Sequence, residues 1–307
     1  MIYLPTIRQL QYLVALHRLG HFGRAAEACY VSQSTLSAGL RELETLLGVV
    51  LVERSRRVVR FTPTGEAVVK RAVRLLAEAD SIAELARASG KPLSGDLRLG
   101  VIPTIAPFLL PVVLPGLRRQ WPDLRLFLRE DLSGPACEAL GAGHLDCLLL
   151  ALPYPCGDVE HELLFEDPIC LAFHPADLPD PPDVVQPEAI DESRLLLLED
   201  GHCLKEHALA ACSHSLFRPD PAVLGTSLHT LVQMVESRIG LTLLPQLAVA
   251  AGILSGTSIA TRPIASAHAS RSIALAWRAT SPRADEYRLL AASLRAAHGG
   301  APAAAAA

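Results

Sequence analysis

The sequence predicts a chain of mixed α and α/β class, with an amino-terminal winged helix-turn-helix, a long linker helix and a two-lobed α/β domain at the carboxyl end. Three observations lead to this prediction. Residues 7–48 contain three segments in which apolar residues recur at helical spacing. A heptad pattern follows at 68–86, and from residue 97 strand-like and helix-like patterns alternate. The predicted domains are 1–61, 62–90 and 91–300, followed by a disordered tail at 301–307.

The first three helices form a helix-turn-helix whose last helix is the longest. The first helix covers 7–18, and a short second helix covers Phe22–Cys29, where three alanines permit close packing. The third helix begins after Ser32, a residue suited to an N-cap, and closes at Gly48. Its apolar stripe comprises Leu36, Leu40, Leu43 and Leu47. We therefore expect this helix to pack on one face and to present the other to solvent.

The solvent face of the third helix carries small and amide-bearing side chains that can reach base edges in the major groove. They are Gln33, Ser34, Thr35, Ser37 and Arg41. An ordinary solvated helix face has a similar composition. Residues 51–61 then predict a basic β-wing, in which Arg54, Arg56 and Arg57 suit contacts to phosphate or to a minor groove.

A long helix begins at Thr62 and Pro63, a cap residue followed by proline at the first helical position. Its apolar residues step by four and three, as in a dimerising coiled coil, although packing on its own domain would give the same pattern. They are Val68, Ala72, Leu75, Ala79, Ile82 and Ala86. The segment 90–95 ends this helix and marks a domain boundary.

The remainder alternates between strands and helices, which predicts parallel sheets with covering helices. The expected first-lobe elements are strands at 97–102, 124–130 and 145–151, and helices at 107–120 and 135–142. Two strands, 159–165 and 169–173, are expected to cross into a second lobe. That lobe would hold 195–198, a helix at 202–211, a helix capped by Ser227 and a strand at 241–244. The chain would return through 271–277 to a final helix at 282–297.

Charge is distributed unevenly along the chain. Residues 1–90 hold 12 Lys/Arg against 8 Asp/Glu, a balance of +4, which leaves −8 for the rest of a chain whose net charge is −4. The amino-terminal part alone is therefore suited to nucleic acid. The start of the sequence lacks a secretory pattern and no apolar run is long enough for a membrane span, so we expect a soluble cytoplasmic protein.

Cys203 and Cys212 stand nine positions apart in a segment that favours helix. Nine residues of helix rise roughly 13.5 Å, whereas a disulfide requires Cα atoms within about 7 Å. Pairing of these two cysteines would therefore unwind the segment. The other five are expected to be reduced, buried residues: Cys29, Cys137, Cys147, Cys156 and Cys170.

A metal site built from His202, His207, His214 and the two cysteines is a further reading of the same segment. The spacing matches no standard zinc template, and we expect neither a metal nor a cofactor. The sequence also lacks a nucleophile elbow and a glycine-rich phosphate loop.

Several motifs in the first 65 residues resemble those of the LysR-type transcription regulators. They are Gln33-Ser34-Thr35-Leu36-Ser37, Leu40-Arg41-Glu42-Leu43-Glu44, Glu53-Arg54 and Phe61-Thr62-Pro63-Thr64-Gly65. The resemblance implies a DNA-binding regulator, not an enzyme, with a dimerising linker helix and a regulatory domain like a periplasmic binding protein. It also implies assembly as a dimer of dimers on double-stranded promoter DNA, acting with RNA polymerase as activator or repressor.

Within that family, the regulatory domain is similar to that of the members that sense hydrogen peroxide. The matching segments are 102–104, 143–147, 198–204 with Cys212, 226–228 and 240–245. The similarity implies that Cys203 is peroxidatic, that Cys212 is resolving, and that the disulfide controls oxidative-stress genes until a cellular thiol reductant resets it. The implied peroxide pocket comprises Thr104, Ser133, His202, Lys205 and Glu206.

Local chemistry supports a reactive Cys203, since it lies at the start of a predicted helix with His202 and Lys205 as neighbours. The sequence departs from these relatives at Lys205-Glu206, which replace arginine-aspartate, at Ser133, which replaces threonine, and at Ala222, which replaces histidine. Two other functions fit the same features: a LysR-type regulator with a small organic effector between its lobes, and a thiol-dependent peroxidase or oxidoreductase. A solute-binding protein would fit the lobes but not the amino-terminal domain.

Overall fold

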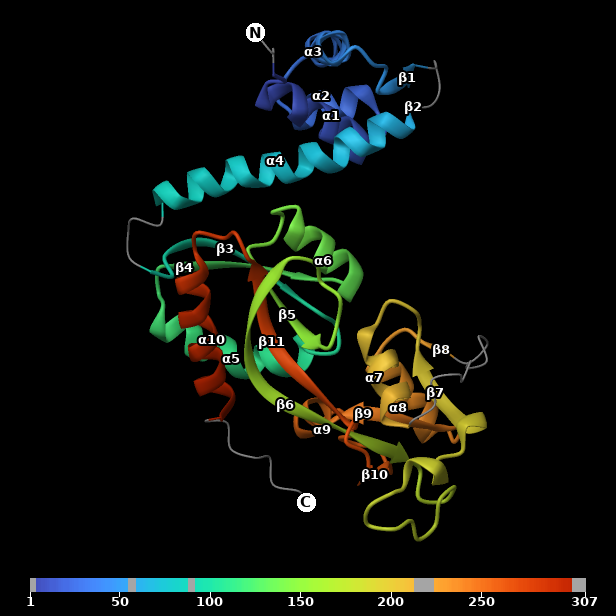
Figure 1. Ribbon diagram of the computed structural model, residues 1–307. Coiled ribbons are helices and arrows are strands. Elements are labelled where there is room, and N and C mark those ends of the chain that lie inside the picture. Colours follow the sequence, from blue (N-terminus) through green and yellow to red (C-terminus); the bar gives the residue numbers. More distant parts are fainter. Residues whose placement is uncertain (1–3, 55–58, 88–91, 213–223, 300–307) are drawn as a thin grey trace. The chain divides into compact units, whose positions relative to one another are not determined.

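The computed structural model describes residues 4–54, 59–87, 92–212 and 224–299. The chain divides into two compact units, Met1–Arg87 and Ala88–Ala307, which are described separately (Figure 1). The predicted tail, 301–307, lies outside the described residues. Within them, no helix is both long and apolar enough to cross a membrane.

The amino-terminal unit contains the predicted helix-turn-helix. Its helices are α1 (Ile7–Leu19), α2 (Phe22–Ala28), α3 (Gln33–Leu47) and α4 (Pro63–Arg87). Ser32 caps α3 by accepting a hydrogen bond from the Thr35 amide, and Gly48 ends it, as the sequence predicts. Leu36, Leu40 and Leu43 are buried in the core of this unit, which fixes the opposite face of α3 toward solvent.

The wing is an antiparallel pair of short strands, β1 (Val52–Arg54) and β2 (Val59–Phe61). One carboxylate joins it to α3, because Glu44 accepts hydrogen bonds from the amides of Leu51 and Val52. The helix α4 then passes close to the start of the wing. A Cβ added to Gly65 would lie 2.2 Å from the carbonyl oxygen of Leu51, so only glycine allows this approach.

Gly65→Ala should lower the free energy of unfolding of the amino-terminal unit by about 1–3 kcal/mol, since the new methyl group meets backbone that cannot move aside. Urea denaturation followed by far-UV circular dichroism measures the change. Thr64→Ala alters the neighbouring exposed position and should stay within about 0.5 kcal/mol of the parent protein. Equal stability of the two variants would contradict the prediction.

The carboxy-terminal unit is built on nine described strands that pair in the order β4-β3-β5-β11-β6-β9-β7-β8, with β10 also on β6. The first lobe combines parallel strands with three helices and the antiparallel β11. Its elements are β3 (Gly95–Val101), α5 (Ala106–Gln120), β4 (Leu124–Glu130), α6 (Ser133–Gly141), β5 (Cys147–Leu152), β11 (Ser270–Arg278) and α10 (Ala284–Gly299).

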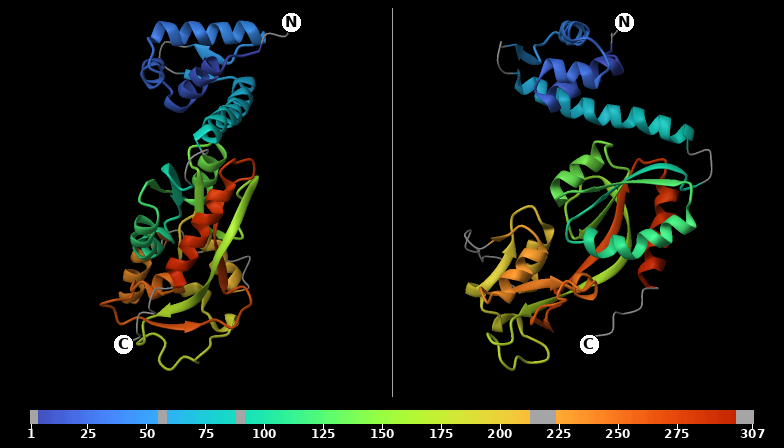
Figure 2. Two further views of the ribbon diagram at one scale, coloured as in Figure 1. Left: turned by 90° about the vertical axis from the view of Figure 1, so that its left-hand side faces the viewer. Right: turned by 180° about the vertical axis from the view of Figure 1, so that it is seen from behind.

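The second lobe is smaller and includes the segment with the cysteine pair. Its elements are the 3₁₀ turns Pro187–Ala189 and Glu192–Arg194, β7 (Leu195–Leu198), α7 (Cys203–Ala211), β8 (Leu224–Gly225), α8 (Leu228–Glu236), β9 (Leu241–Pro245), α9 (Gln246–Ala250) and β10 (Ala260–Pro263). Figure 2 shows β6 running from one lobe into the other. The predicted α/β class and the two lobes are thus confirmed.

One strand corrects the sequence prediction. β6 runs without interruption over Val159–Phe173, where we expected two strands with a break between them. Its first part pairs with β11 and its last residues pair with β9 and β10. The charged residue at the expected break, Asp167, is buried and held by partners from distant parts of the chain. Those partners are distant in sequence, so the local pattern predicted two strands where the structure has one.

Candidate redox site and DNA-binding surface

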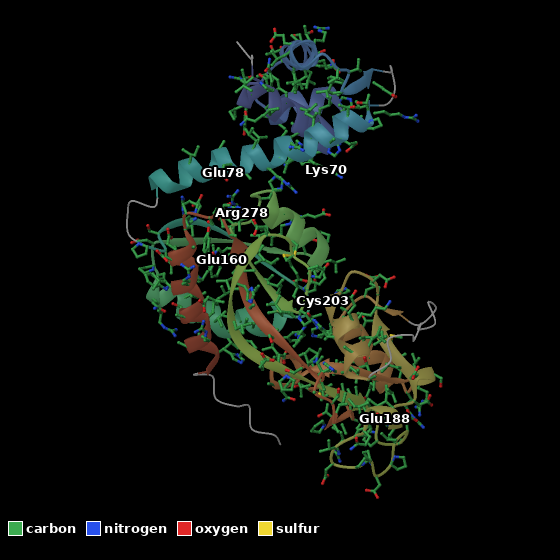
Figure 3. All side chains as sticks on the ribbon, in the orientation of Figure 1. Lys70, Glu78, Glu160, Glu188, Cys203 and Arg278 are labelled. Carbon is green, nitrogen blue, oxygen red and sulfur yellow. A yellow bond between two sulfur atoms is a disulfide. The ribbon has the colours of Figure 1, made fainter. Side chains whose placement is uncertain are left out.

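Cys203 is the first residue of α7 and lies between the two lobes of the carboxy-terminal unit (Figure 3). The turn before it depends on Gly201, whose φ of +100° is a conformation that other residues rarely adopt. The chain therefore leaves β7, turns at Gly201 and enters the helix at the cysteine. Cys203 is only 3% exposed, which leaves its sulfur in a mostly dry environment.

The first lobe supplies the groups that stabilise the thiolate of Cys203. Burial raises the pKa of Cys203, while the hydroxyl of Ser133, the charge of Arg271 and the backbone amide of Ala151 act in the opposite direction. Ser133 begins α6 and is itself buried. These three influences favour the thiolate but do not outweigh burial, so the pKa of Cys203 stays above its ordinary value.

Thr104 belongs to a second buried group centred on Arg271. The Arg271 guanidinium donates from Nη1 to Thr104 Oγ1 at 2.8 Å and from Nη2 to the Thr104 carbonyl at 3.0 Å. Its Nε donates to Asp167 Oδ2 at 3.0 Å, and Asp167 Oδ1 accepts from the Leu247 amide. Because Thr104 Oγ1 already accepts from Arg271, its own proton is left to donate to another group.

The structure corrects which charges influence Cys203. Burial lowers the pKa of His202, which leaves that imidazole neutral at neutral pH, and Lys205 Nζ is paired with Asp200. Glu206 is exposed, and its charge raises the pKa of Cys203. The positive charge that lowers the pKa of Cys203 comes from Arg271, while the pocket roles of His202 and Lys205 stay predictions.

Cys212 caps the other end of α7, as an unpaired and buried residue. Burial raises its pKa to about 11, with a smaller contribution from Glu192. The intervening residues are helical throughout, so the two Cα atoms are separated by roughly 13.5 Å along the helix axis. Cys203 and Cys212 cannot pair in this conformation.

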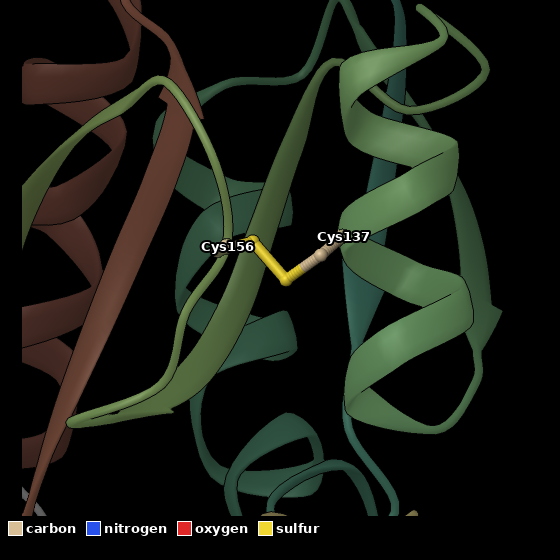
Figure 4. Close-up of a disulfide and its surroundings, with 2 residues drawn as sticks. All are labelled: Cys137 and Cys156. Atoms are coloured by element: carbon tan, nitrogen blue, oxygen red, sulfur yellow. A yellow bond between two sulfur atoms is a disulfide. The ribbon is translucent and has the colours of Figure 1, made fainter.

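Two cysteines expected to be reduced are joined instead. Cys137 on α6 and Cys156, in the segment between β5 and β6, form a disulfide with Cα atoms 5.2 Å apart (Figure 4). The expectation failed because nothing local brings positions 19 apart together; the packing of α6 beside β5 does so. The other three, Cys29, Cys147 and Cys170, are free, as expected.

The alkylation rate of Cys203 should rise with pH from neutral into alkaline solution, by about tenfold per pH unit while the thiol remains mostly protonated. The sign follows from burial, which raises the pKa of Cys203 and so keeps the thiolate scarce at neutral pH. Iodoacetamide labelling quantified by mass spectrometry measures the rate. Ser133→Ala should slow it further, whereas Ser133→Thr keeps a hydroxyl and should react at nearly the parental rate. A pH-independent rate would contradict the prediction.

Each of the two units matches a known protein family. Residues 7–66 match the bacterial regulatory helix-turn-helix protein of the lysR family, and residues 90–299 match the LysR substrate binding domain. The chain belongs to the LysR family of transcription regulators. It is therefore a DNA-binding regulator and not an enzyme.

Individual relatives of this LysR-family regulator cover nearly its whole length. EstR of Acinetobacter baylyi is 42% identical over 291 residues, which are 94% of this chain and 95% of EstR. The hydrogen peroxide-inducible genes activator of Dickeya chrysanthemi is 39% identical over 290 residues, with 94% and 95% covered. The solved structure of full-length OxyR from Pseudomonas aeruginosa matches with a TM-score of 0.76 at 37% identity, covering 95% of each chain.

Five of the predicted DNA-contacting side chains of this LysR-family regulator belong to α3. Gln33, Ser34, Thr35 and Arg41 are exposed and Ser37 is half-buried. Arg54 ends β1, whereas Arg56 and Arg57 lie outside the described residues. The hydroxyls of Ser34 and Thr35 each lie 2.8 Å from the Ser32 hydroxyl, so this end of α3 is already organised by its cap.

Some apolar side chains of the linker helix α4 are buried and others are exposed. Ala72 is buried in the core of the amino-terminal unit, while Leu75 and Ile82 are 47% and 68% exposed. Packing on its own domain thus accounts for part of the heptad pattern only.

Sequence reasoning missed four residues around Cys203: Tyr154, Asp167, His207 and Arg271. Arg271 and Asp167 form a buried ion pair in which both side chains are almost fully enclosed. An arginine two positions before the apolar run 273–277 was an available signal. His207 Nε2 lies 3.1 Å from the Pro153 carbonyl and Tyr154 is electrostatically coupled to Cys203, but no local pattern marked either residue.

Proposed function

We propose that this LysR-family regulator senses hydrogen peroxide through Cys203 and Cys212 and controls genes of oxidative-stress defence. One observation supports this most directly: Cys203 begins α7, and Ser133, Ala151 and Arg271 all favour its thiolate. A relative of similar length is named for hydrogen peroxide-inducible genes. The proposed peroxide site comprises Thr104, Ser133, His202, Lys205 and Glu206.

The proposed chemistry proceeds in two balanced steps. The Cys203 thiolate attacks one peroxide oxygen and the O–O bond breaks, which gives sulfenic acid and a hydroxide that takes a proton. The Cys212 thiol then attacks the Cys203 sulfur, the S–O bond breaks and water leaves. The hydroxyls of Ser133 and Thr104 would stabilise the departing hydroxide by hydrogen bonding.

The second step compels a change of conformation, because α7 holds the two thiols apart. We propose that residues 202–225 refold when the Cys203–Cys212 disulfide forms; of these, 213–223 lie outside the described residues, as does Ala222. The refolded segment would rotate subunits of a dimer of dimers on double-stranded promoter DNA and alter transcription by RNA polymerase. A cellular thiol reductant would reset the switch in the cytoplasm.

Peptide mapping tests the proposal. The full chain is treated with one equivalent of hydrogen peroxide, alkylated, digested and analysed by mass spectrometry. A peptide linking Cys203 to Cys212 is expected, together with a DNase I footprint whose length differs between the reduced and oxidised protein. Absence of that peptide under conditions that oxidise Cys203 would overturn the switch.

Two further measurements separate the alternatives. A thiol-dependent peroxidase would consume many equivalents of peroxide when supplied with a dithiol, whereas the proposed sensor reacts about once in each oxidation cycle. A regulator that binds an organic effector would change its DNase I footprint when a metabolite is added under reducing conditions. Its footprint would not change with peroxide.

A further inference from the structure

The Cys137–Cys156 disulfide joins two elements that both border the Cys203 site. Cys137 lies one helical turn after Ser133, whose hydroxyl lowers the pKa of Cys203. Cys156 ends the segment Pro153–Cys156, which follows β5, the strand that contains Ala151. Both bonded cysteines are half-buried, whereas Cys147, Cys170, Cys203 and Cys212 are buried. The disulfide is therefore more open to reagents in solution than those four thiols are.

The segment Pro153–Cys156 also contacts α7. His207 on α7 is neutral because burial lowers its pKa, so its Nε2–H donates to the Pro153 carbonyl at 3.1 Å. Its Nδ1 is buried without a hydrogen-bond partner among the described residues. Pro153 and Pro155 are exposed, so burial contributes little to holding the segment in place. The disulfide to α6 and the hydrogen bond from α7 hold it instead.

Tyr154 lies between those two connections. Its hydroxyl is near α6, since a Cβ added to Gly134 would lie 3.5 Å from it. Burial raises the pKa of Tyr154, and negative charge at Cys203 and Glu206 acts in the same direction. The segment thus brings an aromatic side chain within electrostatic reach of a thiol that is only 3% exposed. Without the disulfide, the segment would keep the hydrogen bond from His207 at its Pro153 end and would lose its link to α6 at Cys156.

We propose that Cys137 and Cys156 form a second redox couple, whose disulfide holds the Pro153–Cys156 segment over the Cys203 site and so limits access to that thiol. Oxidation takes one hydrogen from each thiol, forms the S–S bond and converts one hydrogen peroxide into two waters. A dithiol reverses it by exchange, becoming a disulfide itself. The inference rests on the proposed function only in naming Cys203 as the thiol whose access matters.

The redox couple is tested without the proposed switch. A Cys203→Ser/Cys212→Ser variant of the full chain is equilibrated in glutathione buffers that span cellular conditions, and the Cys137–Cys156 peptide is quantified by mass spectrometry. We expect the disulfide to be reduced at the reducing end and to return after peroxide treatment. A pair that stays oxidised throughout, or that never oxidises, overturns the proposal even if Cys203 proves to sense peroxide.

Access to Cys203 is tested by alkylation. A Cys137→Ser/Cys156→Ser variant is compared with the oxidised parent, and the expected rate of Cys203 labelling by iodoacetamide is roughly fivefold higher, because a released segment opens more often. Cys29→Ser is the matched control and should label at the parental rate. Equal rates in the double variant and the parent would overturn the gating role, and this readout does not depend on whether Cys203 pairs with Cys212.

Discussion

Replacing Arg271 with alanine should lower the free energy of unfolding of the carboxy-terminal unit by about 3–5 kcal/mol, the usual cost of removing one partner of a buried ion pair. The side chains of Arg271 and Asp167 are 0% and 1% exposed, so Asp167 would keep a buried charge without its partner. Thr104 would lose both hydrogen bonds from Arg271. Urea denaturation followed by tryptophan fluorescence measures the loss, since both tryptophans belong to this unit.

Two further variants test whether the loss of stability is specific to the buried Arg271–Asp167 ion pair. Arg288→Ala removes solvent-exposed ion pairs to Glu160 and Asp285 and should cost about 0–1 kcal/mol. Arg271→Lys keeps the charge but not the fork of donors, so its stability should lie between that of the parent and that of the alanine variant. If Arg271→Ala were no more damaging than Arg288→Ala, the Arg271–Asp167 pair would not organise the site.

Cys203→Ser should abolish the response to peroxide altogether. The variant lacks the sulfur that is oxidised in the proposed first step, so neither a disulfide at Cys212 nor an oxidant-dependent footprint should form. Cys212→Ser should differ from it, because oxidation would stop at a sulfenic acid on Cys203. Trapping with dimedone and mass spectrometry distinguishes the two variants.

Cys170→Ser provides the matched control for that experiment. Cys170 is also buried, but its sulfur donates to the Leu244 carbonyl at 3.3 Å, a role that a serine hydroxyl can fill. This variant should keep the full response. A Cys203→Ser protein whose footprint still changes with peroxide would show that another group senses the oxidant.

The sequence could predict those features that depend on neighbouring residues. The cap at Ser32, the leucine stripe of α3, the proline start of α4 and the alternation after residue 95 all report on local structure, and the helices and strands follow them closely. The motif around Cys203 likewise placed that thiol at the start of a helix.

Features that depend on distant residues were missed. The interruption expected in β6 reflected Asp167, whose partners are 80 and 104 positions away along the chain. The same distance hid Arg271 from the predicted pocket, and the disulfide between Cys137 and Cys156 arises only when α6 packs beside β5. His202 and Lys205 looked like helpers because they are neighbours in sequence, yet burial neutralises one and Asp200 pairs with the other.

The hydrogen bonds of Arg271 limit how such a regulator can evolve. The same guanidinium positions Thr104 and compensates a buried carboxylate, so a substitution that alters reactivity at this position also reduces the amount of folded protein. Lys205, Glu206 and Tyr154 are not fully buried and carry no comparable stability cost. We therefore expect related regulators to set different peroxide thresholds at these three positions, while the buried arginine stays unchanged.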